Sequence, residues 1–99
     1  MLIDLPIQEY AGWRTVKAEI VDVAPHLPAT FAVHKCPWYS GWRVSHVETG
    51  AFVALGNTKR AALAEAIKRS AKVTPERYHG AVRKQFSEYR KRYGAALAA

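Results

Sequence analysis

The chain has 99 residues, of which 49% are hydrophobic and 23% charged, and its formal net charge is +7. This length and balance predict one folded domain spanning residues 1–99, and they exclude a disordered chain. No stretch approaches the ~20 apolar residues of a membrane-spanning helix. The single Cys36 has no second cysteine to pair with, and the acidic N-terminal segment lacks the basic start of a secretory signal. We therefore expect a cytoplasmic protein.

The first half of the chain predicts strands. Residues 1–12 form an extended arm or an edge strand, because Pro6 interrupts their apolar residues. Residues 13–55 predict an antiparallel sheet, and the alternation of Val16, Ala18 and Ile20 is typical of a half-buried strand. Shorter strands are expected over 30–36, 42–47 and 51–55, with Gly50 in the last turn.

The second half predicts two helices. The first, over 57–72, begins at a capping residue, Asn57 or Thr58, and its expected buried face holds Leu63, Ala66, Ile67 and Ala71. The second, over 74–93, begins at Thr74-Pro75-Glu76, a capping hydroxyl followed by Pro at the first helical position. The expected fold is therefore α+β: an antiparallel meander of three to four strands, followed by two C-terminal helices packed on one face.

The second predicted helix carries a narrow aromatic stripe. At 100° per residue its members fall within roughly 80°. They are Tyr78, Val82, Phe86, Tyr89 and Tyr93. Such a stripe faces the core of the monomer or forms a homodimer interface.

Positive charge is concentrated in the helical half. Residues 1–55 carry a formal charge of −1, whereas residues 56–99 carry +8. This asymmetry indicates an anionic partner, either nucleic acid or an acidic protein surface, unless the charges only solvate exposed helix faces. The candidate contacts on the helices are Lys59, Arg60, Lys68, Arg69, Lys72, Arg83, Lys84, Arg90, Lys91 and Arg92.

The segment PWYSGWR adds aromatic candidates. Pro37 to Gly41 are expected to form a loop that presents Trp38 and Tyr39, and Arg43 is a further candidate contact on the following strand. Trp42, Val44 and His46 alternate on one strand face, which favours a core or platform role for Trp42.

Catalytic and metal-binding signatures are weak. His34 and Cys36 share a strand face. Together with His46 they could form a small metal or hydrolase site, with His26 as a fourth metal ligand. The spacing is not that of zinc sites, and the phosphate-binding glycine motifs and HExxH are absent. We expect no metal, no cofactor and no enzymatic activity, with a small Cys/His site as an alternative.

Residues 41–66, GWRVSHVETGAFVALGNTKRAALAEA, resemble hairpin-then-helix units in small proteins of phages and mobile elements. Gly56 and Thr58 are similar to the G-x-T helix start of HicB-like antitoxins, and the meander followed by a helix resembles double-stranded-RNA-binding domains. The resemblance implies an accessory protein in the host bacterial cytoplasm that binds a host machine, as anti-CRISPR inhibitors do.

We therefore expect a small non-enzymatic binding protein. It would dock through basic helix faces on nucleic acid or on an acidic surface of a host protein or nucleoprotein complex. The alternative is a dimeric DNA-binding regulator that associates through the aromatic stripe.

Overall fold

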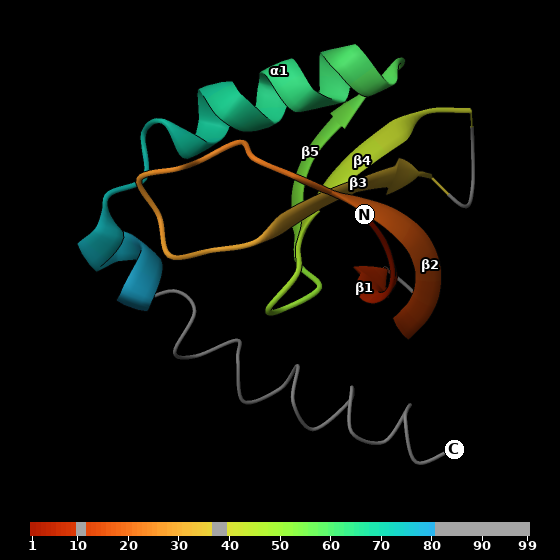
Figure 1. The fold of residues 1–99 in the computed structure, drawn as a ribbon, viewed down its shortest axis with the longest axis horizontal. Helices are drawn as coiled ribbons and strands as arrows, with labels where there is room; N and C mark the ends of the chain where they lie inside the picture. Colours follow the sequence, from red (N-terminus) through yellow and green to blue (C-terminus); the bar gives the residue numbers. More distant parts are fainter. Residues whose placement is uncertain (10–11, 37–39, 81–99) are drawn as a thin grey trace.

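The computed structural model describes residues 1–9, 12–36 and 40–80, and Figure 1 shows their arrangement. Five strands form one antiparallel sheet in the order β1-β2-β3-β4-β5, so that each strand pairs with its neighbours in sequence. The elements are β1 Leu2–Glu9, β2 Gly12–Val21, β3 Phe31–Lys35, β4 Trp42–His46, β5 Phe52–Gly56 and α1 Lys59–Ser70. A second helix begins at residue 75 and is described as far as residue 80.

The predicted α+β class and the antiparallel meander are confirmed. The sheet has five strands where three to four were expected, because the N-terminal arm pairs with β2 from Leu2↔Glu19 to Glu9↔Gly12. Pro6 is compatible with this ladder because β1 is an edge strand. Gly50 takes φ +67° in the turn before β5, where the sequence placed the turn.

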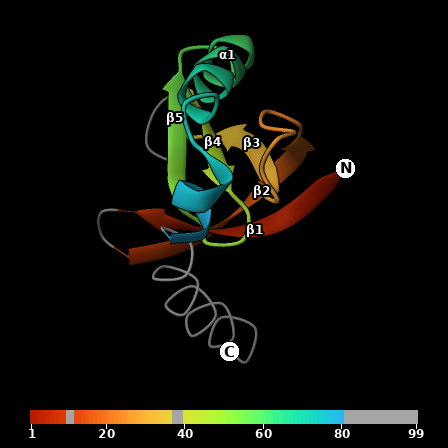
Figure 2. The same ribbon diagram turned by 90° about the vertical axis from the view of Figure 1, so that its left-hand side faces the viewer.

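Two apolar clusters lie on opposite faces of the sheet. On one face α1 covers the middle strands, with Ala62 and Ala66 packed on Val33, Val44 and Ala54. The cluster on the other face lies among β1, β2 and β3, whose ribbons are seen in Figure 2. It consists of Leu5, Ile7, Ala18 and Ala32.

The start of α1 agrees with the prediction, but its buried face differs. The Thr58 hydroxyl caps the helix by accepting a hydrogen bond from the Ala61 N–H at 3.1 Å. The fully buried residues of α1 are Ala62, Ala66 and Ser70. The predicted burial is confirmed at Ala66 and in part at Leu63, which is half-buried against the core, and it is wrong at Ile67 and Ala71, which are exposed.

The cause is a close approach between α1 and β5. A Cβ atom at Gly56 would lie 2.3 Å from the Ala62 nitrogen, so only glycine lets the helix backbone come this near. The helix therefore presents its small residues to the sheet, and Ile67 remains 51% exposed. Within the described part of the chain, no helix has the length and apolarity needed to cross a membrane.

Candidate functional site

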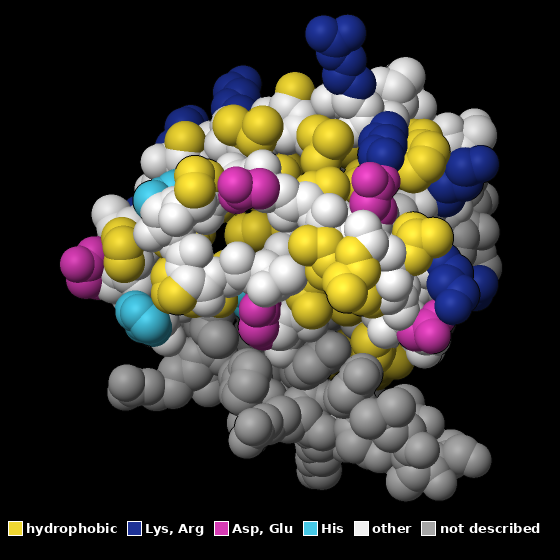
Figure 3. All heavy atoms as spheres, in the orientation of Figure 1, with side chains coloured by type: hydrophobic (Ala, Val, Ile, Leu, Met, Phe, Trp, Pro, Cys, Tyr) yellow, Lys and Arg dark blue, Asp and Glu magenta, His cyan; other side chains and the backbone are white. Residues whose placement is uncertain are grey.

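The outer face of α1 carries a row of cations. The side of the helix opposite the buried Ala62 and Ala66 holds Arg60, Ala64 and Lys68, because two residues along a helix turn the side chain by about 200°. All three outer residues are exposed, as is Lys72 in the turn that follows. Figure 3 shows dark-blue side chains along the rim of the molecule formed by α1.

Two other predicted contacts on α1 are engaged within the protein. Lys59 donates to the Glu19 carboxylate on β2, and this bond holds the pKa of Glu19 below its ordinary value. Arg69 donates to Glu65 at 3.0 Å and to the Val53 carbonyl at 3.1 Å. Among the described residues no ion pair involves Arg60, Lys68 or Lys72, so these three cations form the available part of the row.

Arg43 is not the surface contact that the sequence suggested. It is only 8% exposed, and its guanidinium donates to the Ser45 hydroxyl at 2.8 Å and to the Gly50 carbonyl at 3.2 Å. Ser45 also lies 2.9 Å from Nε2 of the buried His34. These side chains form a satisfied polar network inside the fold, and Arg43 is corrected from a binding residue to a structural one.

The histidines and the cysteine do not converge. Phe31 pairs with His46 and His34 with Arg43, so alternation along β3 and β4 places His34 and His46 on opposite faces of the sheet. Within the ranges 1–9, 12–36 and 40–80, no group of three or more His, Cys, Asp or Glu side chains is placed to hold a metal ion. The alternative metal constellation therefore lacks the geometry it needs.

An apolar hollow of about 310 Å³ lies between the end of α1, the start of β5 and Tyr78. His46 lines it, but both of its ring nitrogens are already bonded, to Thr49 at 2.7 Å and to Tyr78 at 2.9 Å. The polar groups of His46 are therefore occupied, and the lining of the hollow is mainly apolar.

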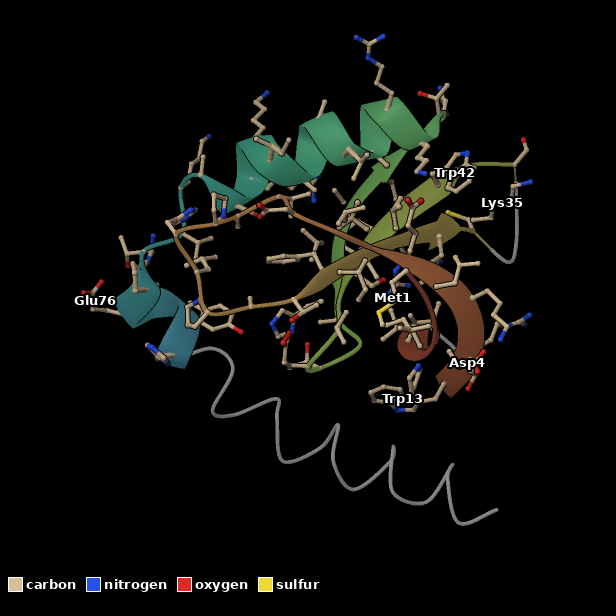
Figure 4. The ribbon with its side chains drawn as sticks, viewed as in Figure 1. Met1, Asp4, Trp13, Lys35, Trp42 and Glu76 are labelled. Carbon is tan, nitrogen blue, oxygen red and sulfur yellow. The ribbon has the colours of Figure 1, made fainter. Side chains whose placement is uncertain are left out.

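A second groove, of about 470 Å³, opens where β2 leaves β3 and lies beside the first residue of α1. Trp42 and Lys35, a cross-strand pair of β3 and β4, lie at this end of the sheet, as labelled in Figure 4. The sequence interpretation did not single out Lys35 or Lys17 as contacts, although both lie on predicted strands whose pairing would bring them together.

The remaining predicted contacts lie outside the described residues. They are Trp38, Tyr39, Arg83, Lys84, Arg90, Lys91 and Arg92, together with Val82, Phe86, Tyr89 and Tyr93 of the aromatic stripe. Of that stripe only Tyr78 is described, and it is half-buried against the core.

Comparison with protein-family models, with curated proteins and with solved structures finds no match to this chain.

Proposed function

We propose that this chain is a non-enzymatic binding protein that docks on the phosphate backbone of nucleic acid through the outer face of α1. The observation that carries the proposal is the row of Arg60, Lys68 and Lys72, exposed and without carboxylate partners among the described residues. Sequence-independent binding to nucleic acid rests on such contacts between cations and phosphates.

The distribution of carboxylates supports this choice. The first turn of α1 has no acidic residue, and its last turn has Lys68 and Arg69. The acidic residue within the helix, Glu65, is bonded to Arg69 and leaves the outer row unneutralised. Arg60 and Lys68 lie eight residues apart, about 12 Å along the helix axis and about 80° apart around it, so they share one broad face of α1.

An acidic protein surface is the competing anionic partner. Nucleic acid is favoured because the exposed cations share one face of α1, whose carboxylate Glu65 is already bonded to Arg69, and such a face suits a uniformly anionic polymer, whereas a protein surface carries charges of both signs. The resemblance to phage accessory proteins suggests the setting, in which the chain would bind the nucleic acid of a host nucleoprotein complex.

The test is a mobility shift with a fluorescent duplex in 50 mM salt. The wild-type chain should bind, and the charge-reversed variant Lys68→Glu/Lys72→Glu should bind at least tenfold more weakly. Arg77→Glu, an exposed cation on the second helix, controls for net charge. Equal binding by wild type and variant would refute the proposal. Retention of an acidic protein but of no nucleic acid would replace it with the competing partner.

A further inference from the structure

Strands β2 and β3 separate at a defined place. Their ladder comprises Val21↔Phe31, Ile20↔Ala32 and Glu19↔Val33 and then stops, although β2 continues to pair with β1. Figures 1 and 2 show β2 curving away from β3 beyond this point. The groove beside α1 lies in the resulting opening.

Like charges disfavour a continuation of this ladder. Two further steps in the same register would set Lys17 of β2 directly opposite Lys35 of β3, and like charges in that position destabilise a sheet. Lys17 is paired instead with Asp4 on β1, at 2.6 Å. Lys35 has no carboxylate partner among the described residues, and its ammonium lies 5.7 Å from the ring centroid of Trp42.

The groove combines an apolar floor with a basic rim. Its apolar side chains are Leu2, Val16, Val33 and Trp42, and its basic side chains are Lys17, Lys35 and Lys59. Trp42 is half-buried and packs against the α1 core cluster. The one carboxylate in the lining, Glu19, is bonded to Lys59, so it does not neutralise Lys35.

A ligand for this groove must be an anion with a flat apolar body. An anionic oxygen would pair with the Lys35 ammonium, since Lys17 is already bonded to Asp4, and a planar ring would stack on Trp42. A nucleotide has both parts, a phosphate and a base with a π-face. An aliphatic anion would leave the Trp42 ring without a stacking partner.

We propose that the opening between β2 and β3 binds a nucleoside phosphate, with its phosphate at Lys35 and its base on Trp42. A bound base takes the place of the Lys35 ammonium over the ring, and the ammonium moves to the phosphate. The ligand is either a free mononucleotide or an unpaired nucleotide within a single strand. In the second case the inference rests on the proposed function of α1, whose first residue, Lys59, borders the groove.

The experiment compares three probes at 50 mM salt: adenosine monophosphate by calorimetry, and a labelled single-stranded dT12 and a blunt duplex by anisotropy. Trp42→Leu should weaken dT12 binding about 5- to 150-fold, the range expected for one stacked base, and should leave duplex binding unchanged. Trp42→Phe should retain part of the affinity. Trp42-dependent binding of the monophosphate supports a free nucleotide as ligand, and dependence for dT12 alone supports the strand.

Lys35→Gln provides a test that does not disturb the core, because Lys35 is exposed. It should lower the salt slope of dT12 binding by about 0.7, the value for one phosphate contact on a single strand, whereas Arg77→Gln should leave the slope unchanged. The inference is overturned if neither adenosine monophosphate nor dT12 binds the wild-type protein, or if Trp42→Phe and Lys35→Gln both bind as wild type does. Trp42-dependent binding with no effect of the α1 variants on the duplex supports the groove and removes the proposed function of α1. Loss of duplex binding in the α1 variants with no effect of the Trp42 variants on either of the other probes supports α1 and removes the groove.

Discussion

The imidazole Nε2 of His46 lies 2.9 Å from the hydroxyl of Tyr78, and this hydrogen bond joins β4 to the first turn of the second helix. The Tyr78 hydroxyl donates to the Pro28 carbonyl at 3.3 Å, so it accepts from His46. On the other side of the ring, Thr49 Oγ1 lies 2.7 Å from Nδ1 and accepts from the Ala51 N–H at 3.2 Å. When His46 is neutral with its proton on Nε2, Nδ1 accepts from the Thr49 hydroxyl, and a proton on Nδ1 would require that hydroxyl to turn and accept instead.

Protonation of His46 should therefore destabilise the fold. Burial lowers the pKa of His46 from its ordinary value of 6.5, against an opposing effect of the Glu48 carboxylate 3.3 Å away. The unfolded chain then binds more protons than the folded chain, so stability should fall as the pH drops below about 6.5. Urea midpoints at pH 7.5 and 5.5 should differ more for wild type than for His46→Gln.

The comparison with His46→Gln isolates one of the chain's four histidines. Tyr78→Phe removes the hydrogen bonds to His46 and to the Pro28 carbonyl and should cost about 1–3 kcal/mol at pH 7.5, at about 0.5–1.5 kcal/mol for each bond. A His46→Gln variant with the same pH dependence as wild type would show that His46 is not the titrating group.

The close contact between α1 and β5 predicts that Gly56→Ala is disruptive. The added methyl group would meet the backbone of Ala61 and Ala62, which cannot rotate away, so α1 must shift. We expect a loss of about 1–3 kcal/mol in urea unfolding, as for other overpacked sites. Gly80→Ala is the matched control, since nothing lies within 4 Å of its added methyl group, and it should stabilise the helix by about 0.5–1 kcal/mol.

This contact also explains where sequence reasoning succeeded and failed on α1. The Thr58 cap was predictable because capping depends on residues three positions apart. The buried face was not, because the pattern favours large apolar residues, whereas the space left by Gly56 selects Ala62. The depth of a helix on a sheet depends on a glycine in another element, which helical periodicity does not report.

The candidate site shows the same division between local and distant causes. The exposed positions of Arg60 and Lys68 follow from helical spacing alone. A charged residue in an alternating strand pattern predicts a surface position, and this prediction fails for Arg43. Arg43 can be buried because the Ser45 hydroxyl and the Gly50 carbonyl accept hydrogen bonds from its guanidinium. The role inferred for Lys35 depended on the register between β2 and β3, which only the structure supplies.

The buried network predicts that Ser45→Ala is destabilising without affecting binding. Removing the hydroxyl deletes its hydrogen bonds with Arg43 Nε at 2.8 Å and with His34 Nε2 at 2.9 Å. We expect a loss of about 1–3 kcal/mol by urea unfolding, the sum of two hydrogen bonds at about 0.5–1.5 kcal/mol each. The affinity for a duplex should stay within twofold of wild type. A tenfold weaker affinity in a folded variant would return Arg43 to the binding surface.

The division of the α1 cations into available and engaged residues predicts different salt slopes. If Arg60, Lys68 and Lys72 each contact one phosphate, the logarithm of duplex affinity should fall with the logarithm of salt concentration with a slope of about −2.7, or about 40-fold between 50 and 200 mM. Neutralising one of them, as in Lys68→Gln, should reduce the slope by about 0.9. Arg69→Gln removes the same charge from the same helix, but Arg69 is bonded to Glu65 and Val53, so the slope should stay near that of wild type. Equal reductions in both variants would show that α1 acts through its total charge and not through the outer row.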